Sequence, residues 1–296
     1  MMRAMSDATP RDRLLRGVPA TERRLDVNGV ATAVLEGGEG PPVMLLHGGI
    51  ATGGAYWAPV ITRLVETHRV IAPDAPGLGE SEPLARLDYA TFAGWLGELL
   101  RLTCDESPTL IAHSLFASLC ARFAADERDA LGRLVLMGAP AIGRYRPPPA
   151  LLLSAMWLNL RPSEQSLDRF LRWPFLDPDR TRERDPEWLE AFLAYLVARN
   201  AVPHVKRTMR QAIKAGTKQI PHTDLERIQT PTVLLWGRHD RMAPLRLAER
   251  ANSRFGWPLF VIDDAGHVPF VEQPDAFLEA LDNAMALRDD AVRRAG

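Results

Sequence analysis

Short, continuous runs of apolar residues recur along this 296-residue chain, and helix-like stretches separate them. A strand buried on both faces has this uninterrupted apolar character, whereas a half-exposed strand alternates. The runs are Pro42–Leu46, Val70–Ala72, Leu110–Ala112, Leu134–Met137, Val233–Trp236 and Leu259–Ile262. The helix-like stretches are Ala55–Val65, Thr91–Thr103, Leu115–Ala125, Arg246–Asn252 and Pro274–Leu287. This alternation predicts an α/β fold, with a mostly parallel central sheet and helices on both of its faces.

The pattern changes at three places, and these changes predict the domain organisation. Residues 1–20 are charged and unpatterned, so we expect a flexible N-terminal tail. Asn28-Gly29 joins two strand-like runs, 24–27 and 30–35, which is a strong hairpin signal. From 141 to 218 no run resembles a strand, and helix-like stretches such as Glu187–Arg199 carry several aromatic residues. We therefore predict a core formed by 21–140 and 219–296, and a helical insertion formed by 141–218.

Composition narrows the classes of partner. The net charge is −1, from 36 basic and 37 acidic residues, so the chain lacks the basic excess typical of nucleic-acid-binding domains. No apolar run is long enough to span a bilayer, and the N-terminus lacks the apolar core of a signal peptide. The spacing of Cys104 and Cys120 fits neither a metal site nor a redox motif, which favours free thiols. We expect a cytoplasmic monomer or homodimer that acts on a small molecule, without a nucleic-acid, membrane or metal partner.

The first motif with chemical content is a serine between an apolar strand and a helix, in Thr109–Ala117. A sharp strand-to-helix turn would lift Ser114 clear of the backbone at a helix N-terminus. There an anion that forms during acyl transfer meets free N–H groups and the positive end of the helix dipole. A serine at such a junction can also serve only as a helix cap. Ser114 is therefore a candidate nucleophile that needs support from other residues.

A second motif, His47-Gly48-Gly49, closes an earlier buried strand. Glycines at this point allow the backbone to aim an N–H group at a substrate oxygen. Together with the N–H of the residue that follows the nucleophile, this group would form a two-donor oxyanion hole. We predict Gly49 and Leu115 as the donors, with Ile50 as the alternative if the loop is shifted by one residue.

Two further residues follow the last two apolar runs. Asp240 comes shortly after Val233–Trp236, and His267 comes shortly after the final run. A serine needs a base to remove its proton, and the base needs a carboxylate to fix its tautomer. The chain order Ser114, Asp240, His267 is that of hydrolases with a strand–serine–helix elbow. Because all three residues follow strands, they are predicted to meet at the carboxyl end of the sheet, where such folds bind ligands.

With these motifs the chain resembles the α/β-hydrolase superfamily from about Glu22 to Leu287. Two further segments look like superfamily motifs, Asp74–Ser81 (DAPGLGES) and Gly266–Pro274 (GHVPFVEQP), and Trp57 lies ten residues after His47. The resemblance implies that the insertion is a cap over the active site. It also implies Ser114 as nucleophile, His267 as base and Asp240 as acid, without a cofactor.

The elbow departs from the superfamily pattern at one position. The usual G-x-S-x-G-G is replaced by Ala112-His113-Ser114-Leu115-Phe116-Ala117. A small alanine before the turn is a mild change, but Phe116 places a ring where the elbow normally has little or no side chain. Either the helix is shifted locally, or the ring points into a gap or a pocket wall.

The serine argues against the haloalkane dehalogenases and epoxide hydrolases of this superfamily, which use an aspartate nucleophile. We therefore expect a serine hydrolase that cleaves a carboxylic ester or lactone of a small, mainly apolar substrate. One alternative is hydrolysis of a carbon–carbon bond in ring-fission products, because the loop His47–Gly54 resembles that subfamily; Val268 stands where those enzymes generally have tryptophan. Another is a homologue that binds ligands and turns over slowly. The predicted substrate contacts are His47, Gly48, Ile50, His113 and Trp157.

Overall fold

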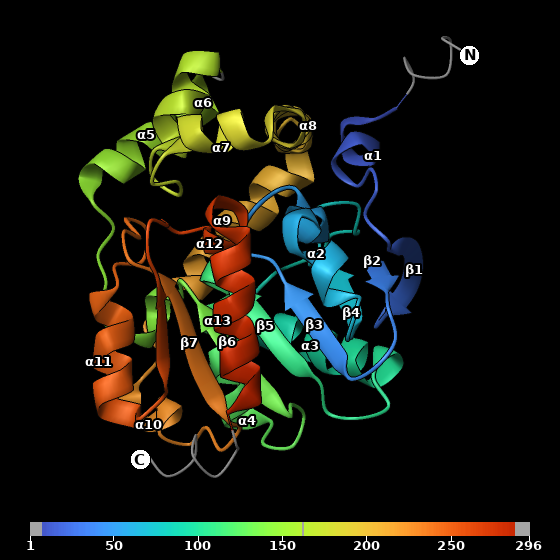
Figure 1. The fold of residues 1–296 in the computed structure, drawn as a ribbon, viewed down its shortest axis with the longest axis vertical. Coiled ribbons are helices and arrows are strands. Elements are labelled where there is room, and N and C mark those ends of the chain that lie inside the picture. The colour runs from blue at the N-terminus through green and yellow to red at the C-terminus, as the bar shows by residue number, and fades with distance from the viewer. Residues whose placement is uncertain (1–7, 162, 288–296) are drawn as a thin grey trace.

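A single eight-stranded sheet forms the centre of the computed structural model, which describes residues 8–161 and 163–287 (Figure 1). Its strand order is β1-β2-β4-β3-β5-β6-β7-β8, and every pair from β4 to β8 is parallel. The strands are β1 Thr21–Val27, β2 Val30–Gly37, β3 Pro42–Leu46, β4 Arg69–Pro73, β5 Thr109–His113, β6 Arg133–Met137, β7 Thr232–Gly237 and β8 Leu259–Ile262. Each predicted apolar run therefore lies within a strand, and the predicted fold class is confirmed.

The one hairpin of the described sheet lies where the Asn-Gly pair predicted it. β1 pairs with β2 in antiparallel register, with Val27 opposite Val30. Asn28 and Gly29 both have positive φ, 53° and 80°. This is the backbone of the two-residue turn that matches strand twist, and asparagine and glycine adopt it at low cost. The hairpin extends the parallel sheet at the edge next to β4, with which β2 pairs antiparallel.

The order of the strands reverses at β3. The chain passes from β3 to β4 on one side, then returns to place β5 on the other side of β3. In parallel sheets the crevice at the carboxyl ends of the strands where the order reverses is the usual ligand site. The loop after β3 and the turn after β5, which carry the Gly48-Gly49 pair and Ser114, lie on the two sides of this point.

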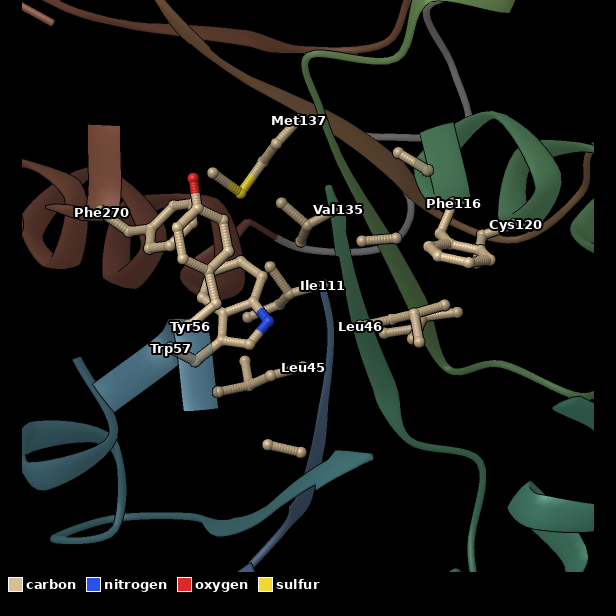
Figure 2. Close-up of a cluster of buried hydrophobic side chains, with 14 of the residues drawn as sticks. Leu45, Leu46, Tyr56, Trp57, Ile111, Phe116, Cys120, Val135, Met137 and Phe270 are labelled. Atoms are coloured by element: carbon tan, nitrogen blue, oxygen red, sulfur yellow. The ribbon is translucent and has the colours of Figure 1, made fainter. Parts of the chain in front are cut away.

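Helices cover both faces of the sheet. Successive side chains of β3 point to opposite faces, and Figure 2 shows Leu45 on the side of Trp57 and Phe270, and Leu46 on the side of Phe116. The helices are α1 Pro10–Leu14, η1 Gly53–Trp57, α2 Ala58–Leu64, α3 Tyr89–Thr103, α4 Ser114–Asp126, η2 Pro140–Ile142, α5 Pro149–Leu160, α6 Glu164–Leu171, α7 Pro178–Arg184, α8 Pro186–Asn200, α9 Pro203–Gly216, α10 His222–Leu225, α11 Arg246–Phe255, α12 Pro269–Glu272 and α13 Pro274–Ala286. The core therefore has two apolar layers, one on each side of the sheet.

Helices α5 to α9 (Pro149–Gly216) lie between β6 and β7 in the chain, within the segment predicted as a helical insertion, and we refer to them as the cap. Figure 1 shows α5 to α8 above the end of the sheet to which the parallel strands point. α9 packs against α4, the helix that begins at Ser114, so the cap rests on the core next to that residue. Among the described residues, no helix combines the length and apolar composition needed to cross a bilayer.

The prediction of a flexible tail is wrong for residues 10–14, which form α1. Thr9 caps this helix in a reciprocal box with Asp12, a local signal that the absence of an apolar pattern obscured. Arg11 is buried and forms ion pairs with Glu22, at 2.7 Å, and with Asp74, at 3.2 Å. These partners come from distant parts of the chain, so the sequence of the tail did not indicate them. Residues 1–7 lie outside the described residues.

Candidate active site

Ser114 occupies the sharp turn between β5 and α4. Its φ is +55°, a left-handed value that is uncommon for any residue other than glycine, and its side chain is only 8% exposed. The preceding His113 is still extended, with φ −114° and ψ 140°. The backbone thus changes direction within one residue, as the strand–serine–helix motif predicts. A non-glycine residue held in this region is strained, and such strain concentrates at functional sites.

Three strand ends bring the predicted triad together. The Nε2 atom of His267 lies 2.8 Å from Oγ of Ser114, and its Nδ1 atom lies 2.7 Å from Oδ2 of Asp240. All three side chains are buried. Ser114 follows β5, Asp240 follows β7 and His267 follows β8. The order expected from the sequence is therefore also a continuous chain of hydrogen bonds in space.

The hydrogen bonds of Asp240 determine the tautomer of His267. Its Oδ1 atom accepts from the N–H groups of Met242, at 2.8 Å, and Ala243, at 2.7 Å, which fixes the plane of the carboxylate. Oδ2 then faces Nδ1 of the imidazole and can only accept, so Nδ1 carries the proton. Nε2 is left with a lone pair directed at the Ser114 hydroxyl. In this arrangement His267 is ready to take the serine proton.

The Gly48-Gly49 loop passes directly over Ser114 and Leu115. A Cβ atom added at Gly49 would lie 2.4 Å from Cδ1 of Leu115, and one added at Gly48 would lie 3.0 Å from Cβ of Ser114. A side chain at Gly48 would crowd Ser114, and one at Gly49 would require the end of the Leu115 side chain to move. The N–H of Leu115 lies in the first turn of α4, where N–H groups have no acceptor within their own helix. The N–H of Ile50 donates to the carbonyl of Gly48, at 2.7 Å, so the alternative donor is already engaged.

Gly138, which follows β6, is a site residue that the sequence analysis missed. Its φ is +55°, and a Cβ atom there would lie 2.6 Å from Cε1 of His267 and 3.4 Å from Oδ2 of Asp240. The backbone at the end of β6 therefore forms a wall for the imidazole. The signal in the sequence was a glycine after an apolar run, which many strand ends share. Only the contact with His267 distinguishes it.

Glu272 belongs to a motif quoted above, but no role was predicted for it. Its Oε2 accepts from the N–H of Gly266, at 2.7 Å, next to His267, and its Oε1 accepts from Leu176 of the cap, at 2.6 Å. The N–H of His267 donates to the carbonyl of Pro174, at 2.7 Å. The loop that carries the histidine is thus tied to the cap. Burial raises the pKa of Glu272 to about 7, in spite of the backbone N–H groups that favour its charged form.

The ring of Phe116 is fully buried in the core. It stacks on Phe92 of α3, with ring centroids 5.3 Å apart, and meets His47 edge-on at 5.5 Å. Figure 2 shows it beside Cys120 and Leu46, on the face of the sheet covered by α3 and α4. α4 begins at Ser114 with the elbow intact. The large residue therefore fills space beneath the elbow, which corresponds to the predicted alternative of a ring that points into a gap, and α4 needs no shift to accommodate it.

Two of the predicted substrate contacts are buried histidines. His47 is fully buried: its Nδ1 lies 2.6 Å from the carbonyl of Gly48, and its Nε2 accepts from the N–H of Ala75 at 2.9 Å. Both ring nitrogens are thus used by the protein. His113 donates from Nε2 to the carbonyl of His267, at 2.8 Å, and its Nδ1 has no partner. Burial lowers the pKa of both rings, that of His47 to about 4, so both are neutral.

Trp157 is another of the predicted substrate contacts. It lies on α5 with 42% of its surface exposed, and the guanidinium of Arg161 lies 5.5 Å from its ring centroid. In contrast, Trp188 of α8 is buried and stacks on Phe192 at 5.0 Å. Within the described part of the chain, no three His, Cys, Asp or Glu side chains are grouped so that they could hold a metal ion.

A strained serine at the reversal point of a parallel sheet, hydrogen-bonded to a histidine and an aspartate, places this chain in the class of α/β-fold hydrolases. Sequence comparison gives the family itself. The model of the alpha/beta hydrolase family matches residues 43–280, and the chain belongs to this family.

Three known proteins are similar to this chain along most of their length. The pimeloyl-[acyl-carrier protein] methyl ester esterase of Aeromonas hydrophila is 24% identical over 256 residues, which are 83% of this chain and 96% of that protein. The 2-hydroxy-6-oxononadienedioate/2-hydroxy-6-oxononatrienedioate hydrolase of Escherichia coli is 28% identical over 257 residues, 82% of this chain and 86% of that one. Among solved structures, 2-hydroxy-6-oxo-6-phenylhexa-2,4-dienoate hydrolase from Rhodococcus superposes with a TM-score of 0.77 at 24% identity, over 90% of this chain and 99% of that one.

Proposed function

We propose that this protein is a serine hydrolase that cleaves a carboxylic ester or lactone of a small, mainly apolar substrate through an acyl-enzyme. The observation that carries the proposal is the continuous relay from Ser114 through His267 to Asp240, with both hydrogen bonds between 2.7 and 2.8 Å. Ser114 sits on a strained elbow at the amino end of α4, where N–H groups lack helical acceptors. These features are the requirements for attack on an acyl carbonyl and for stabilising the resulting oxyanion.

The proposed reaction begins when Nε2 of His267 takes the Ser114 proton and Oγ attacks the carbonyl carbon. The developing oxyanion is held by the N–H groups of Gly49 and Leu115. Collapse of the tetrahedral intermediate breaks the ester bond, and the imidazolium gives its proton to the departing alcohol oxygen. Water then attacks the acyl-enzyme with the same histidine as base, which releases the acid and restores Ser114. No cofactor takes part in this sequence.

Two kinds of relative bear on the bond that is cleaved. One bears the name of a methyl ester esterase, and another that of a hydrolase of dienedioate-type substrates. Hydrolysis of a carbon–carbon bond is therefore the second candidate, and the similarity of the loop His47–Gly54 to that subfamily favours it. Val268 instead of tryptophan after His267 favours the ester.

A covalent probe tests the serine first. The purified protein is incubated with a fluorophosphonate, and the intact mass is measured beside that of a Ser114→Ala variant. We expect one adduct on the parent protein and none on the variant. A second serine, Ser118 on the same helix, is buried and its hydroxyl accepts from Ala141, so Ser118→Ala is a matched control that keeps the adduct. No adduct on the folded parent protein would overturn the proposal and favour a homologue that only binds ligands.

Steady-state kinetics then separate the two bonds. Graded p-nitrophenyl esters and lactones are compared with a vinylogous diketone of the ring-fission type, and kcat/KM is measured for each. We expect the esters to be the better substrates and Ser114→Ala to lower kcat on the order of 10⁶-fold. A preference for the diketone would replace the ester proposal with carbon–carbon hydrolysis while leaving the serine mechanism in place.

A further inference from the structure

Helix α5 presents an apolar row to solvent. Five large apolar side chains on this helix are more than 40% exposed, and Leu160, at 69%, is the most exposed of them. They are Leu152, Leu153, Met156, Trp157 and Leu160. Their spacing of three and four residues places them on one face, the pattern that normally marks the side of a helix facing a core. Here that side has no covering element among the described residues.

The opposite side of α5 is already used by the protein. Leu151 and Ser154 are buried there, and α5 packs against α6. In Figure 1 these two helices form the outer end of the cap, away from α8 and α9. A helix that is apolar on both sides has a partner on both sides or is buried. The exposed row therefore indicates a partner that is not part of the fold.

The charges at the two ends of α5 indicate the chemistry of this partner. Between residues 141 and 161 the chain has no aspartate or glutamate, and it has three arginines, all exposed: Arg144 and Arg146 before the helix and Arg161 after it. Arg161 also stacks over the ring of Trp157. An apolar row with a tryptophan near one end, and with cations at both ends, matches a lipid surface with anionic headgroups.

We infer that α5 docks the cap on an anionic lipid surface, with the row Leu152–Leu160 in the interface and the three arginines at the headgroups. This goes beyond the proposed hydrolysis, since it concerns where the protein acts. It also differs from the expectation of no membrane partner, which rested on the absence of a spanning segment. A peripheral helix needs no span, because it lies in the plane of the interface.

A second copy of the chain fits this surface less well. A two-fold dimer through α5 would place the same face against itself, and the arginines of each copy would find no carboxylate between residues 141 and 161 of the other. An acidic protein would pair with the arginines, but a row of leucine, methionine and tryptophan along the whole helix offers it no polar partner. A lipid surface with anionic headgroups provides an apolar layer for the row and negative charges for the arginines.

Vesicle flotation measures the docking directly. The full chain is mixed with vesicles of phosphatidylcholine and phosphatidylglycerol, or of phosphatidylcholine alone, and the bound fraction is determined at low and high salt. We expect binding to the mixed vesicles that weakens as salt rises. Leu152→Gln with Leu160→Gln should lower the partition coefficient about tenfold or more, since both side chains leave the interface. Arg144→Gln with Arg146→Gln should lower it roughly tenfold on the mixed vesicles only.

Matched controls come from the same surface chemistry elsewhere in the molecule. Leu102→Gln on α3 removes another exposed leucine, and Arg128→Gln removes another exposed arginine. Both should bind vesicles as the parent does. The proposal is overturned if the parent stays in solution with mixed vesicles, or if Leu102→Gln loses as much binding as the α5 pair. It is also overturned if light scattering shows that the parent is a dimer and that, of these variants, only Leu152→Gln with Leu160→Gln is a monomer. That result would assign the face to a second copy of the chain.

The outcome is independent of the hydrolytic proposal. Ser114→Ala should bind vesicles like the parent protein, and the Leu152/Leu160 pair should keep the fluorophosphonate adduct, because both leucines are exposed on α5 whereas the triad is buried. A protein that binds vesicles but gives no adduct would therefore contradict the hydrolase and leave the docking surface standing. A protein that gives the adduct but does not bind vesicles would contradict the docking surface and leave the hydrolase proposal standing.

Discussion

Helices α4 and α5 have nearly the same length, 13 and 12 residues, but opposite relations to solvent. At the start of α4 polar groups are buried: Ser114 and its neighbours His113 and His267 are each less than 10% exposed. On α5 apolar groups are exposed, up to 69% at Leu160. Both patterns cost free energy. At the start of α4 polar groups lose their contact with water, and on α5 apolar side chains remain in contact with water.

The difference lies in how each cost is offset. Around Ser114 most buried polar atoms find partners in the protein, and the relay to Asp240 is the clearest example. On α5 nothing in the described structure offsets the exposure. We therefore interpret the first region as a site that is assembled by folding, and the second as one that is completed only by a partner. Each prediction below tests one side of this comparison, in order of decreasing effect.

The largest effect is expected at the buried side of the comparison, from Asp240→Asn. The amide oxygen can still accept from Met242 and Ala243, so the amide nitrogen must face Nδ1 of His267. The imidazole then takes the tautomer with its proton on Nε2, and it can no longer accept the serine proton. We expect kcat to fall about 10⁴-fold, with little change in the unfolding midpoint.

Asp263→Asn is the matched control, since this carboxylate follows β8 on the same side of the sheet but is exposed and paired with Arg238. It should leave kcat unchanged. Ester kinetics and urea unfolding of both variants provide the measurement. A small loss of kcat in Asp240→Asn would mean that the tautomer of His267 is not what the buried network controls.

The second prediction concerns the ring beneath the elbow. Phe116→Ala removes a fully buried ring that stacks on Phe92, and the cavity is expected to cost about 3–5 kcal/mol of unfolding free energy. Phe260→Ala, in the edge strand β8, removes a half-buried ring and should cost clearly less. Urea unfolding measures both. Equal losses would show that Phe116 is not the packed residue beneath the elbow that its burial indicates.

Much of this architecture could be predicted from the sequence. Pro42–Leu46 and Leu259–Ile262 are strands with the predicted bounds, because a strand buried on both faces depends on its own apolar run. The triad was predicted because Ser114, Asp240 and His267 each follow such a run. Three features could not be read in the same way. Phe116 and Gly138 depend on what lies across the sheet, and Arg11 depends on Asp74, more than sixty residues away.

Trp157 shows the same limit on the exposed side. Its apolar spacing on α5 is indistinguishable in sequence from that of a helix facing a core, and it was predicted to contact substrate. Trp188, on helix α8 of the same cap, is buried against Phe192. Periodicity identifies the apolar side of a helix, but only the tertiary arrangement decides whether protein, substrate or another surface covers it.

The third prediction concerns Glu272, which joins the cap to the loop that carries His267, and tests whether its carboxyl group is protonated in the folded protein. The pKa of Glu272 is raised from 4.5 to about 7 by burial, so the folded protein holds a proton that the unfolded chain releases between these values. Stability from this group is therefore present below pH 4.5 and is lost as the pH rises to about 7. We expect the unfolding free energy of the parent to fall by about 2 kcal/mol, relative to that of Glu272→Gln, across this range.

Other titrating groups are common to both proteins and cancel in this difference. Burial lowers the pKa of His47 to about 4, so this group changes the unfolding free energy in the opposite direction. Between pH 4 and 6.5 the unfolded chain binds a proton at His47 that the folded protein does not bind. Asp240, whose charge also raises the pKa of Glu272, and Arg184, which donates to the backbone carbonyl of Glu272, are unchanged in the variant. Urea unfolding at pH 5, 6, 7 and 8 gives the two curves. Parallel curves would show that burial does not perturb Glu272.

The smallest effect is expected on α5 itself. Leu152→Gln with Leu160→Gln changes two side chains that are 56% and 69% exposed, so the unfolding free energy should change by no more than about 0.5 kcal/mol. Leu151→Ala, on the inner side of the same helix and 7% exposed, should cost about 2 kcal/mol or more. Thermal and urea unfolding of the two proteins, without vesicles, is the measurement. If the glutamine pair destabilised the protein as much as Leu151→Ala does, the row would be packed against the protein in solution. The contrast between α4 and α5 would then disappear, because both helices would be completed by the fold alone.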